Sequence, residues 1–151
     1  MDTVRKIGGW LVLLGLQIAT TILFAIRELK IYFNFFQTAD WMNITNLKDS
    51  THWRTMFIFE ACFYLFLFAG SFIILILFLS KKQRFRDFYS LYMILCTLGY
   101  IITYFIAKSI ENIPVKKFSD LNTAIFGYII WSAIWISYLY KAERPGKTFI
   151  N

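Results

Sequence analysis

The sequence is poor in charge and in the side chains that carry most enzyme chemistry. Its 151 residues include 17% charged residues, one His and two Cys, whereas soluble domains carry about 25% charged residues. His52 lies in a polar stretch without the cluster of His, Cys or carboxylate groups that a metal site needs. Gly-rich phosphate loops, nucleophile elbows and zinc-protease motifs are also absent from the sequence. We therefore predict no metal, no cofactor and no enzyme activity.

The two cysteines do not indicate redox chemistry. Cys62 and Cys96 lie at different depths of two apolar segments that are expected to run antiparallel. Their Cα atoms are then farther apart than the roughly 7 Å that a disulfide allows. A thiol oxidoreductase built on four helices would need paired, reactive cysteines, and the sequence disfavours that class.

Apolar and aromatic residues are abundant instead. They make up 58% and 21% of the chain, with 17 Phe, 9 Tyr and 5 Trp, more than a soluble domain of this length can cover. A helix needs roughly 20 apolar residues to cross a bilayer, and four windows meet this length, at 7–26, 57–79, 88–107 and 121–140. The sequence predicts an all-α fold, an integral membrane four-helix bundle with an up-down-up-down course, in a single membrane domain over residues 1–151.

The net charge of +7 is interpreted as a topology signal. Of the sixteen Lys and Arg residues, nine lie in three short segments, 1–6, 80–87 and 141–151. Cytoplasmic flanks of membrane spans carry an excess of Lys and Arg, so we predict that both termini are cytoplasmic. Because the basic residues cluster at span ends, we expect the lipid bilayer as partner and no nucleic acid.

The first loop, residues 27–56, begins with an amphipathic helical pattern. Leu29, Tyr32, Phe33 and Phe36 follow the spacing i, i+3, i+4 and i+7. This segment could lie flat as a separate interfacial helix, or it could extend the first helix beyond the bilayer. We favour the interfacial helix, because charged residues precede the pattern. Its aromatic residues Tyr32, Phe33 and Phe36 are candidate partner contacts.

Polar side chains form stripes along the first three predicted spans. They comprise Gln17, Thr21 and Glu28 in the first, Glu60, Tyr64 and Ser71 in the second, and Ser90, Thr97, Tyr104 and Lys108 in the third. One interpretation is that these groups hold the helices together by hydrogen bonds. The other is that they line a polar pathway or a binding groove. The aromatic stripe of the fourth span, which includes Trp135 and Tyr138, is typical of packing or lipid contact.

Glu60 is the residue that the sequence singles out most clearly. An ionisable group within a membrane span is costly and is a functional hypothesis by default. Glu60 lies one turn inside the predicted span 57–79, so a structural ion pair with Arg27, Arg54 or Lys108 is the alternative. Recognition of a ligand, a proton or a partner by Glu60 and its neighbour Tyr64 remains the functional hypothesis.

Several local motifs resemble those of a known family. They are Ile7-Gly8-Gly9-Trp10-Leu11, the acidic Glu60, the basic stretch 81–85 and the segment Ile134-Trp135-Ile136-Ser137-Tyr138 followed by Arg144 and Thr148-Phe149. Together they resemble a bacterial four-span family, domain of unknown function family 2569. The resemblance implies an integral protein of the bacterial cytoplasmic (inner) membrane and carries over no reaction. It makes Trp10, Glu60, Trp135, Tyr138 and Arg144 candidate site residues.

Three functional hypotheses follow from these patterns. The leading one is a noncatalytic accessory or protective protein that binds another membrane protein or a toxin-like ligand. The second is a small proton-coupled exporter in which Glu60 titrates while a cationic substrate is exchanged. The third is a membrane-embedded enzyme, which lacks a visible nucleophile or metal set. The oligomeric state is left open.

Overall fold

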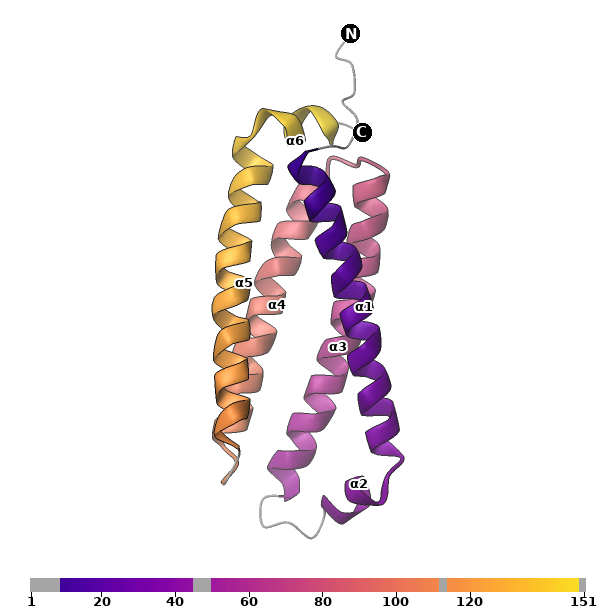
Figure 1. Cartoon of the computed structure of the whole chain (residues 1–151), viewed down its shortest axis with the longest axis vertical. Helices are drawn as coiled ribbons and strands as arrows, with labels where there is room; N and C mark the ends of the chain where they lie inside the picture. The colour runs from indigo at the N-terminus through magenta and orange to yellow at the C-terminus, as the bar shows by residue number, and fades with distance from the viewer. Residues whose placement is uncertain (1–8, 45–49, 112–113, 150–151) are drawn as a thin grey trace.

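The structure confirms an all-α chain with four long apolar helices. This computed structural model describes residues 9–44, 50–111 and 114–149. The helices are α1 (Trp10–Phe36), α2 (Ala39–Asn43), α3 (Ser50–Leu79), α4 (Phe85–Lys108), α5 (Val115–Lys141) and α6 (Glu143–Thr148). By length and composition, α1, α3, α4 and α5 can each cross a membrane. They alternate in direction along the chain (Figure 1), as an up-down-up-down bundle requires.

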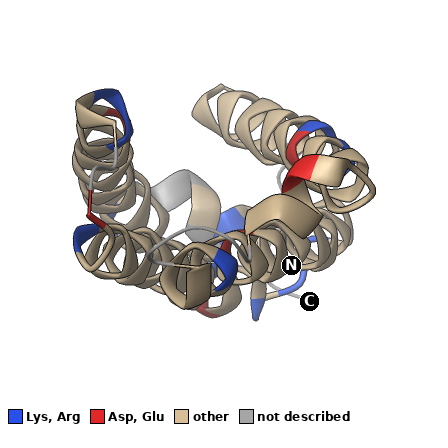
Figure 2. Cartoon of the chain, turned by 90° about the horizontal axis from the view of Figure 1, so that it is seen from below, with Lys and Arg blue, Asp and Glu red and all other residues tan. Residues whose placement is uncertain are grey.

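The four long helices pack in a row that follows the chain order. Within the described residues the main packed pairs are α1 with α3, α3 with α4, and α4 with α5. In the end-on view the helices form an arc that is open on one side (Figure 2). We call the two ends of the bundle the α6 end, where α1 begins, and the α2 end. Helices α1 and α5 are therefore the edges of the row, with the concave side of the arc between them.

The interfacial helix predicted in the first loop is not formed as a separate element. Residues 29–36 continue α1, which ends only at Phe36 and is followed by the short α2. This stretch contains no Gly or Pro to break the helix, and the ring of Phe35 packs against Phe57 of α3 with centroids 4.7 Å apart. The charged side chain of Arg27 is 74% exposed. The alternative prediction, an extended first helix, is therefore the correct one.

The other helices also extend beyond the apolar windows. Helix α3 begins at Ser50 and α5 begins at Val115, seven and six residues before the windows predicted from position 57 and position 121. The N-cap of α5 is Pro114. Pro is favoured near helix starts, where its missing N–H costs nothing. The earlier start places Lys117 in the first turn of α5.

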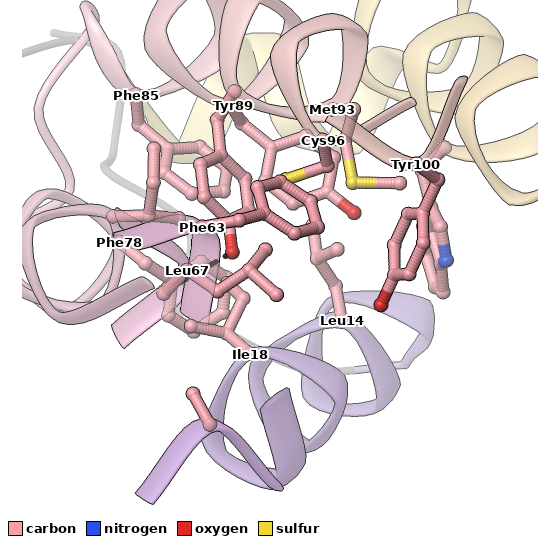
Figure 3. Packing of buried hydrophobic residues seen from close by; sticks show 14 of the residues in the cluster. Leu14, Ile18, Phe63, Leu67, Phe78, Phe85, Tyr89, Met93, Cys96 and Tyr100 are labelled. Carbon is pink, nitrogen blue, oxygen red and sulfur yellow. Dashed lines mark hydrogen bonds between the residues drawn. The ribbon is translucent and has the colours of Figure 1, made fainter. Parts of the chain in front are cut away.

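Most of the buried core residues belong to α3 and α4, the two middle helices of the row. Figure 3 shows Phe63, Leu67 and Phe78 of α3 facing Tyr89, Met93 and Cys96 of α4. A hydrogen bond of 2.7 Å joins the hydroxyls of Ser71 and Tyr92 across the two helices. Cys62 and Cys96 are both free, in agreement with the prediction that they do not pair. Cys62 is exposed and Cys96 is buried.

The C-terminal helix closes the α6 end of the bundle. From α5 the chain turns back across this end toward the start of α1 (Figure 1). Phe149 is 1% exposed, and its ring stacks on Phe85 at 4.6 Å and contacts Phe78 at 5.8 Å. Aromatic pairs of this kind each contribute about 0.5–1.5 kcal/mol beyond their burial. The contact fastens the chain end to the turn between α3 and α4.

Candidate functional site

Glu60 is buried in α3, and two other helices supply its partners. The residue is 4% exposed. Its Oε1 accepts a hydrogen bond from Lys117 Nζ at 2.6 Å, an ion pair, and its Oε2 accepts one from the Tyr32 hydroxyl. The site thus joins α1, α3 and α5. The prediction that Glu60 forms an ion pair with Arg27, Arg54 or Lys108 is wrong. The early start of α5 brings Lys117 to the carboxylate instead.

The local sequence of α5 is unusual for a helix start. Lys116 and Lys117 both lie in its first turn, where the positive end of the helix dipole disfavours cations. Contact with a buried carboxylate offsets this cost for Lys117. The Lys117 side chain is 32% exposed, whereas that of Glu60 is 5% exposed. The lysine therefore reaches from the surface to an acid that is fixed in the interior.

Both members of this ion pair line a cavity of about 270 Å³. All four long helices contribute to its walls, which makes it a feature of the concave side of the row. We call it the Glu60 cavity. Its lining residues are Phe24 of α1, Glu60, Phe63 and Tyr64 of α3, Tyr100 and Thr103 of α4, and Lys117, Asp120, Leu121 and Ala124 of α5. Aromatic rings and two acids thus dominate its walls.

A second, much smaller cavity of about 10 Å³ adjoins the first along the row. We call it the Gln17 cavity. It is lined by Gln17, Ile18 and Thr21 of α1, Ser71 of α3, Tyr89, Tyr92 and Met93 of α4, and Tyr128 of α5. The ring of Tyr128 lies 4.9 Å from that of Tyr100, so this aromatic pair stands between the two cavities.

The Gln17 cavity contains polar atoms that lack partners. Within the described part of the chain, Gln17 Oε1 and the Tyr89 hydroxyl are buried and form no hydrogen bond. An unsatisfied polar group in the bilayer core has a free-energy cost on the order of several kcal/mol. The cavity has room for about one water molecule, which needs two or more polar partners. A water molecule in this cavity, or a small shift of these two neighbouring side chains toward each other, would satisfy both groups.

The polar stripes predicted from the sequence are placed unequally. Gln17 and Thr21 of α1 line the Gln17 cavity, and Glu60 and Tyr64 of α3 line the Glu60 cavity. The stripe predicted for the third span does not line either cavity. Two of its members instead donate hydrogen bonds to carbonyls of their own helix, Ser90 to Arg86 and Thr97 to Met93. Such local bonds remove the need for a partner helix.

The remaining predicted site residues lie elsewhere. Trp10 is 63% exposed at the start of α1. Trp135 is buried and stacks with Trp131 at 6.1 Å, and Tyr138 contacts its edge at 5.9 Å. Arg144 belongs to α6, but its side chain lies outside the described part of the chain. Trp10, Trp135 and Tyr138 are not among the residues beside Glu60, which from the predicted set are Tyr64 and Tyr32.

The predicted aromatic stripe at the end of α1 is divided. Phe33 is 65% exposed, whereas Tyr32 contacts Phe36 and Phe57. A cavity of about 300 Å³ lies among Phe35, Asp40, Asn43, Ile44, Trp53 and Phe57. Its walls are mostly apolar and come from α1, the α2 region and α3 alone. It lacks the ion pair that distinguishes the Glu60 cavity.

Sequence reasoning missed Lys117, Phe24, Tyr100 and Tyr128 as members of the site. A signal for Lys117 exists, because two lysines directly after Pro114 contradict the charge preference of a helix start. Among the described residues no group of three His, Cys, Asp or Glu is placed to hold a metal ion. The chemistry that the site presents is a buried carboxylate paired with an ammonium group.

Comparison with known proteins assigns the chain to a family. No curated protein and no solved structure matches it. A family sequence profile matches residues 4–150, nearly the whole chain, and the family is described as a protein of unknown function, DUF2569. This agrees with the resemblance seen in the sequence motifs and with four helices able to cross a membrane. The chain is a multi-pass membrane protein of unassigned activity and belongs to the DUF2569 family.

Proposed function

We propose that this protein is a noncatalytic membrane binding protein that holds a small amphipathic ligand in the Glu60 cavity. The observation that supports this proposal most directly is a cavity of about 270 Å³ with walls from all four long helices. The cavity reaches a buried carboxylate that is paired with a lysine. Small-molecule sites have this form, mostly apolar walls with a few polar groups that orient the ligand. An accessory or protective role, through capture of a toxic amphiphile, is the cellular role we propose.

The volume favours a small ligand over a partner protein. A transmembrane helix has a diameter of about 10–12 Å with its side chains, and a cavity of about 270 Å³ is too small for a helix. Of the two binding partners that the sequence left open, another membrane protein and a toxin-like ligand, the volume therefore supports the ligand. We favour the ligand, because a bound ligand would also give the polar groups on the concave side of the row a partner.

Orientation determines from which side the ligand arrives. We propose that the chain lies in the bacterial cytoplasmic membrane with both termini inside, because basic residues gather at the α6 end. The α2 end and the Glu60 cavity then face outward. A protein placed in this way would meet amphiphiles that approach the cell from outside.

A cavity-filling substitution tests the proposed function. The protein in lipid nanodiscs is dialysed against three radiolabelled probes that share a benzyl group: cationic benzyltrimethylammonium, its neutral isostere neopentylbenzene, and anionic phenylmethanesulfonate. We expect at least one probe to bind above the level of empty nanodiscs. Ala124→Phe fills the cavity and should abolish that binding, whereas Ala133→Phe on an exposed part of α5 should preserve it. Equal binding by both variants would contradict the proposal.

A proton-coupled exporter is the second candidate, and the Gln17 cavity favours it. Transport needs a route beyond the binding site, and unsatisfied polar groups at Gln17 and Tyr89 continue the polar lining past the Tyr100–Tyr128 pair. Uptake of benzyltrimethylammonium into proteoliposomes under a pH gradient distinguishes the two candidates. Uptake that ignores the gradient and is unaffected by Glu60→Gln would exclude the exporter.

A further inference from the structure

We propose that the Glu60 cavity takes an organic ammonium ion, which replaces the Lys117 ammonium at the Glu60 carboxylate. This inference rests on the proposed function and names the class of its ligand. Lys117 is then a tethered cation of this chain that occupies the ligand's position while the cavity is empty. The three observations that support it are the charges of the cavity, the exposure of the two ionic partners, and the aromatic walls.

The charges favour a cation over an anion. The cavity is lined by two carboxylates, Glu60 and Asp120, and by one ammonium group, that of Lys117. A buried charge can change partners, but leaving it without one is strongly unfavourable. A ligand cation that takes the place of Lys117 keeps Glu60 paired throughout. An anionic ligand would instead separate Lys117 from Glu60 and leave the buried carboxylate beside a second negative charge.

Unequal exposure makes the lysine the partner that can leave. Its side chain is 32% exposed, against 5% for Glu60, and Asp120, which also lines the cavity, is exposed. Long lysine side chains readily place their ammonium group in water while their methylene groups stay on the protein. Lys117 can therefore move outward from the first turn of α5, whereas Glu60 stays in the interior of the row.

The walls of the cavity suit an alkylated ammonium group. Phe24 and Tyr64 meet edge to face at 5.9 Å, and Phe63 and Tyr100 meet edge to face at 5.0 Å. All four rings line the cavity. Aromatic faces attract cations, and sites for quaternary ammonium ligands use aromatic cages of this kind. The apolar rings also exclude water from the carbon atoms of an organic ligand. A hydrated inorganic cation has no carbon atoms and gains nothing from this burial.

The exchange has a mechanical consequence. The Lys117–Glu60 ion pair ties the first turn of α5 to α3, although α5 packs mainly on α4 and α6. When a ligand takes the carboxylate, this tie is released. Ligand binding thereby loosens the α2 end of α5 from α3 while Phe149 continues to hold the α6 end.

Dialysis of the same three probes against variant proteins tests the inference. We expect wild type to bind benzyltrimethylammonium and neither of the other two probes. Lys117→Met should bind it on the order of tenfold more tightly, because the fraction of protein with a free carboxylate rises when the tethered competitor is gone. Glu60→Gln should lose binding. The charge-neutral double variant Glu60→Gln/Lys117→Met should also lose it, and its thermal unfolding shows whether the fold is intact.

The outcomes separate the inference from the function on which it rests. Weaker or unchanged cation binding by Lys117→Met, or undiminished binding by Glu60→Gln, would overturn the exchange at Glu60. Binding of the neutral or anionic probe that Ala124→Phe abolishes would keep the proposed function and overturn the cationic ligand. Failure of wild type and Lys117→Met to bind any probe would overturn both.

Discussion

Glu60 and Lys117 form a pair whose members are not equivalent. The carboxylate is held by α3 in the interior, with a second hydrogen bond from Tyr32. The lysine reaches it from a partly exposed position. Without the carboxylate, the ammonium can turn to water, but without the ammonium, the carboxylate stays where it is. Removing one partner is strongly destabilising when the charge left behind stays buried, and a lysine that can extend into water avoids this cost.

The asymmetry predicts unequal effects on stability when no cation is added. We expect Lys117→Met to lower the free energy of unfolding by about 3 kcal/mol, the cost of an uncompensated buried charge. Glu60→Gln should cost about 1 kcal/mol, since the amide still accepts a hydrogen bond from Tyr32. The double variant should resemble Glu60→Gln. Thermal unfolding in mild detergent checks this, and equal effects of both single variants would contradict it.

At the scale of helices, close packing depends on where glycine meets an aromatic ring. A Cβ atom added at Gly99 of α4 would lie 2.1 Å from Cε2 of Phe63, whereas one at Gly127 of α5 would meet nothing within 4 Å. A Cβ atom added at Gly15 of α1 would lie 3.0 Å from Cε1 of Phe78. The contacts at Gly15 and Gly99 show that α1 and α4 both approach α3 through glycine, while Gly127 faces open space.

A matched pair of alanine substitutions tests this packing. Gly99→Ala should destabilise the protein by about 1–3 kcal/mol, because the ring of Phe63 must move in a filled core. Gly127→Ala should be neutral or stabilising by up to about 1 kcal/mol, since Ala favours helix. Unfolding of both variants in the same detergent gives the comparison. If Phe63→Leu fails to relieve the cost of Gly99→Ala, the ring is not its cause.

The whole molecule is an open row of four helices with a basic end. Lys81, Lys82 and Arg84 lie between α3 and α4 at the end that α6 closes. The Glu60 cavity belongs to the opposite half, toward the α2 end. Figure 2 shows the arc from that end, with charged residues on several helices. Which of the two ends of the row faces the outside of the cell therefore decides whether the Glu60 cavity receives molecules from outside or from inside.

Cysteine labelling in intact cells checks the proposed orientation. In a background with Cys62→Ala and Cys96→Ala, Lys116→Cys should react with a membrane-impermeant maleimide, and Lys82→Cys should not. Both positions are exposed in the structure, so the membrane is the expected cause of any difference. A permeant maleimide should label both and serves as the control. The reverse labelling pattern would place the Glu60 cavity on the cytoplasmic side.

Prediction from the sequence was successful for features that depend on one segment at a time. The four spans follow from apolar length, and Glu60 stands out because it interrupts an apolar run. Prediction failed where two distant segments meet. The partner of Glu60, Lys117, lies 57 positions away in the sequence. Lys117 reaches Glu60 because α5 begins soon after the end of α4, before the apolar window of the fourth span. The prediction of a separate interfacial helix after residue 29 failed for a similar reason, because contacts with α3 favour a longer α1.

The sequence by itself determined that this is a membrane protein with four helices, because hydrocarbon selects for long apolar segments whose backbone is satisfied internally. Only the tertiary structure decided that the row stays open and that Tyr32, Glu60 and Lys117 meet beside a cavity. Helical periodicity defines which residues share a face, but it does not define which face of another helix they meet. In lipid that choice depends on close packing and hydrogen bonds between helices, which only the assembled chain can form.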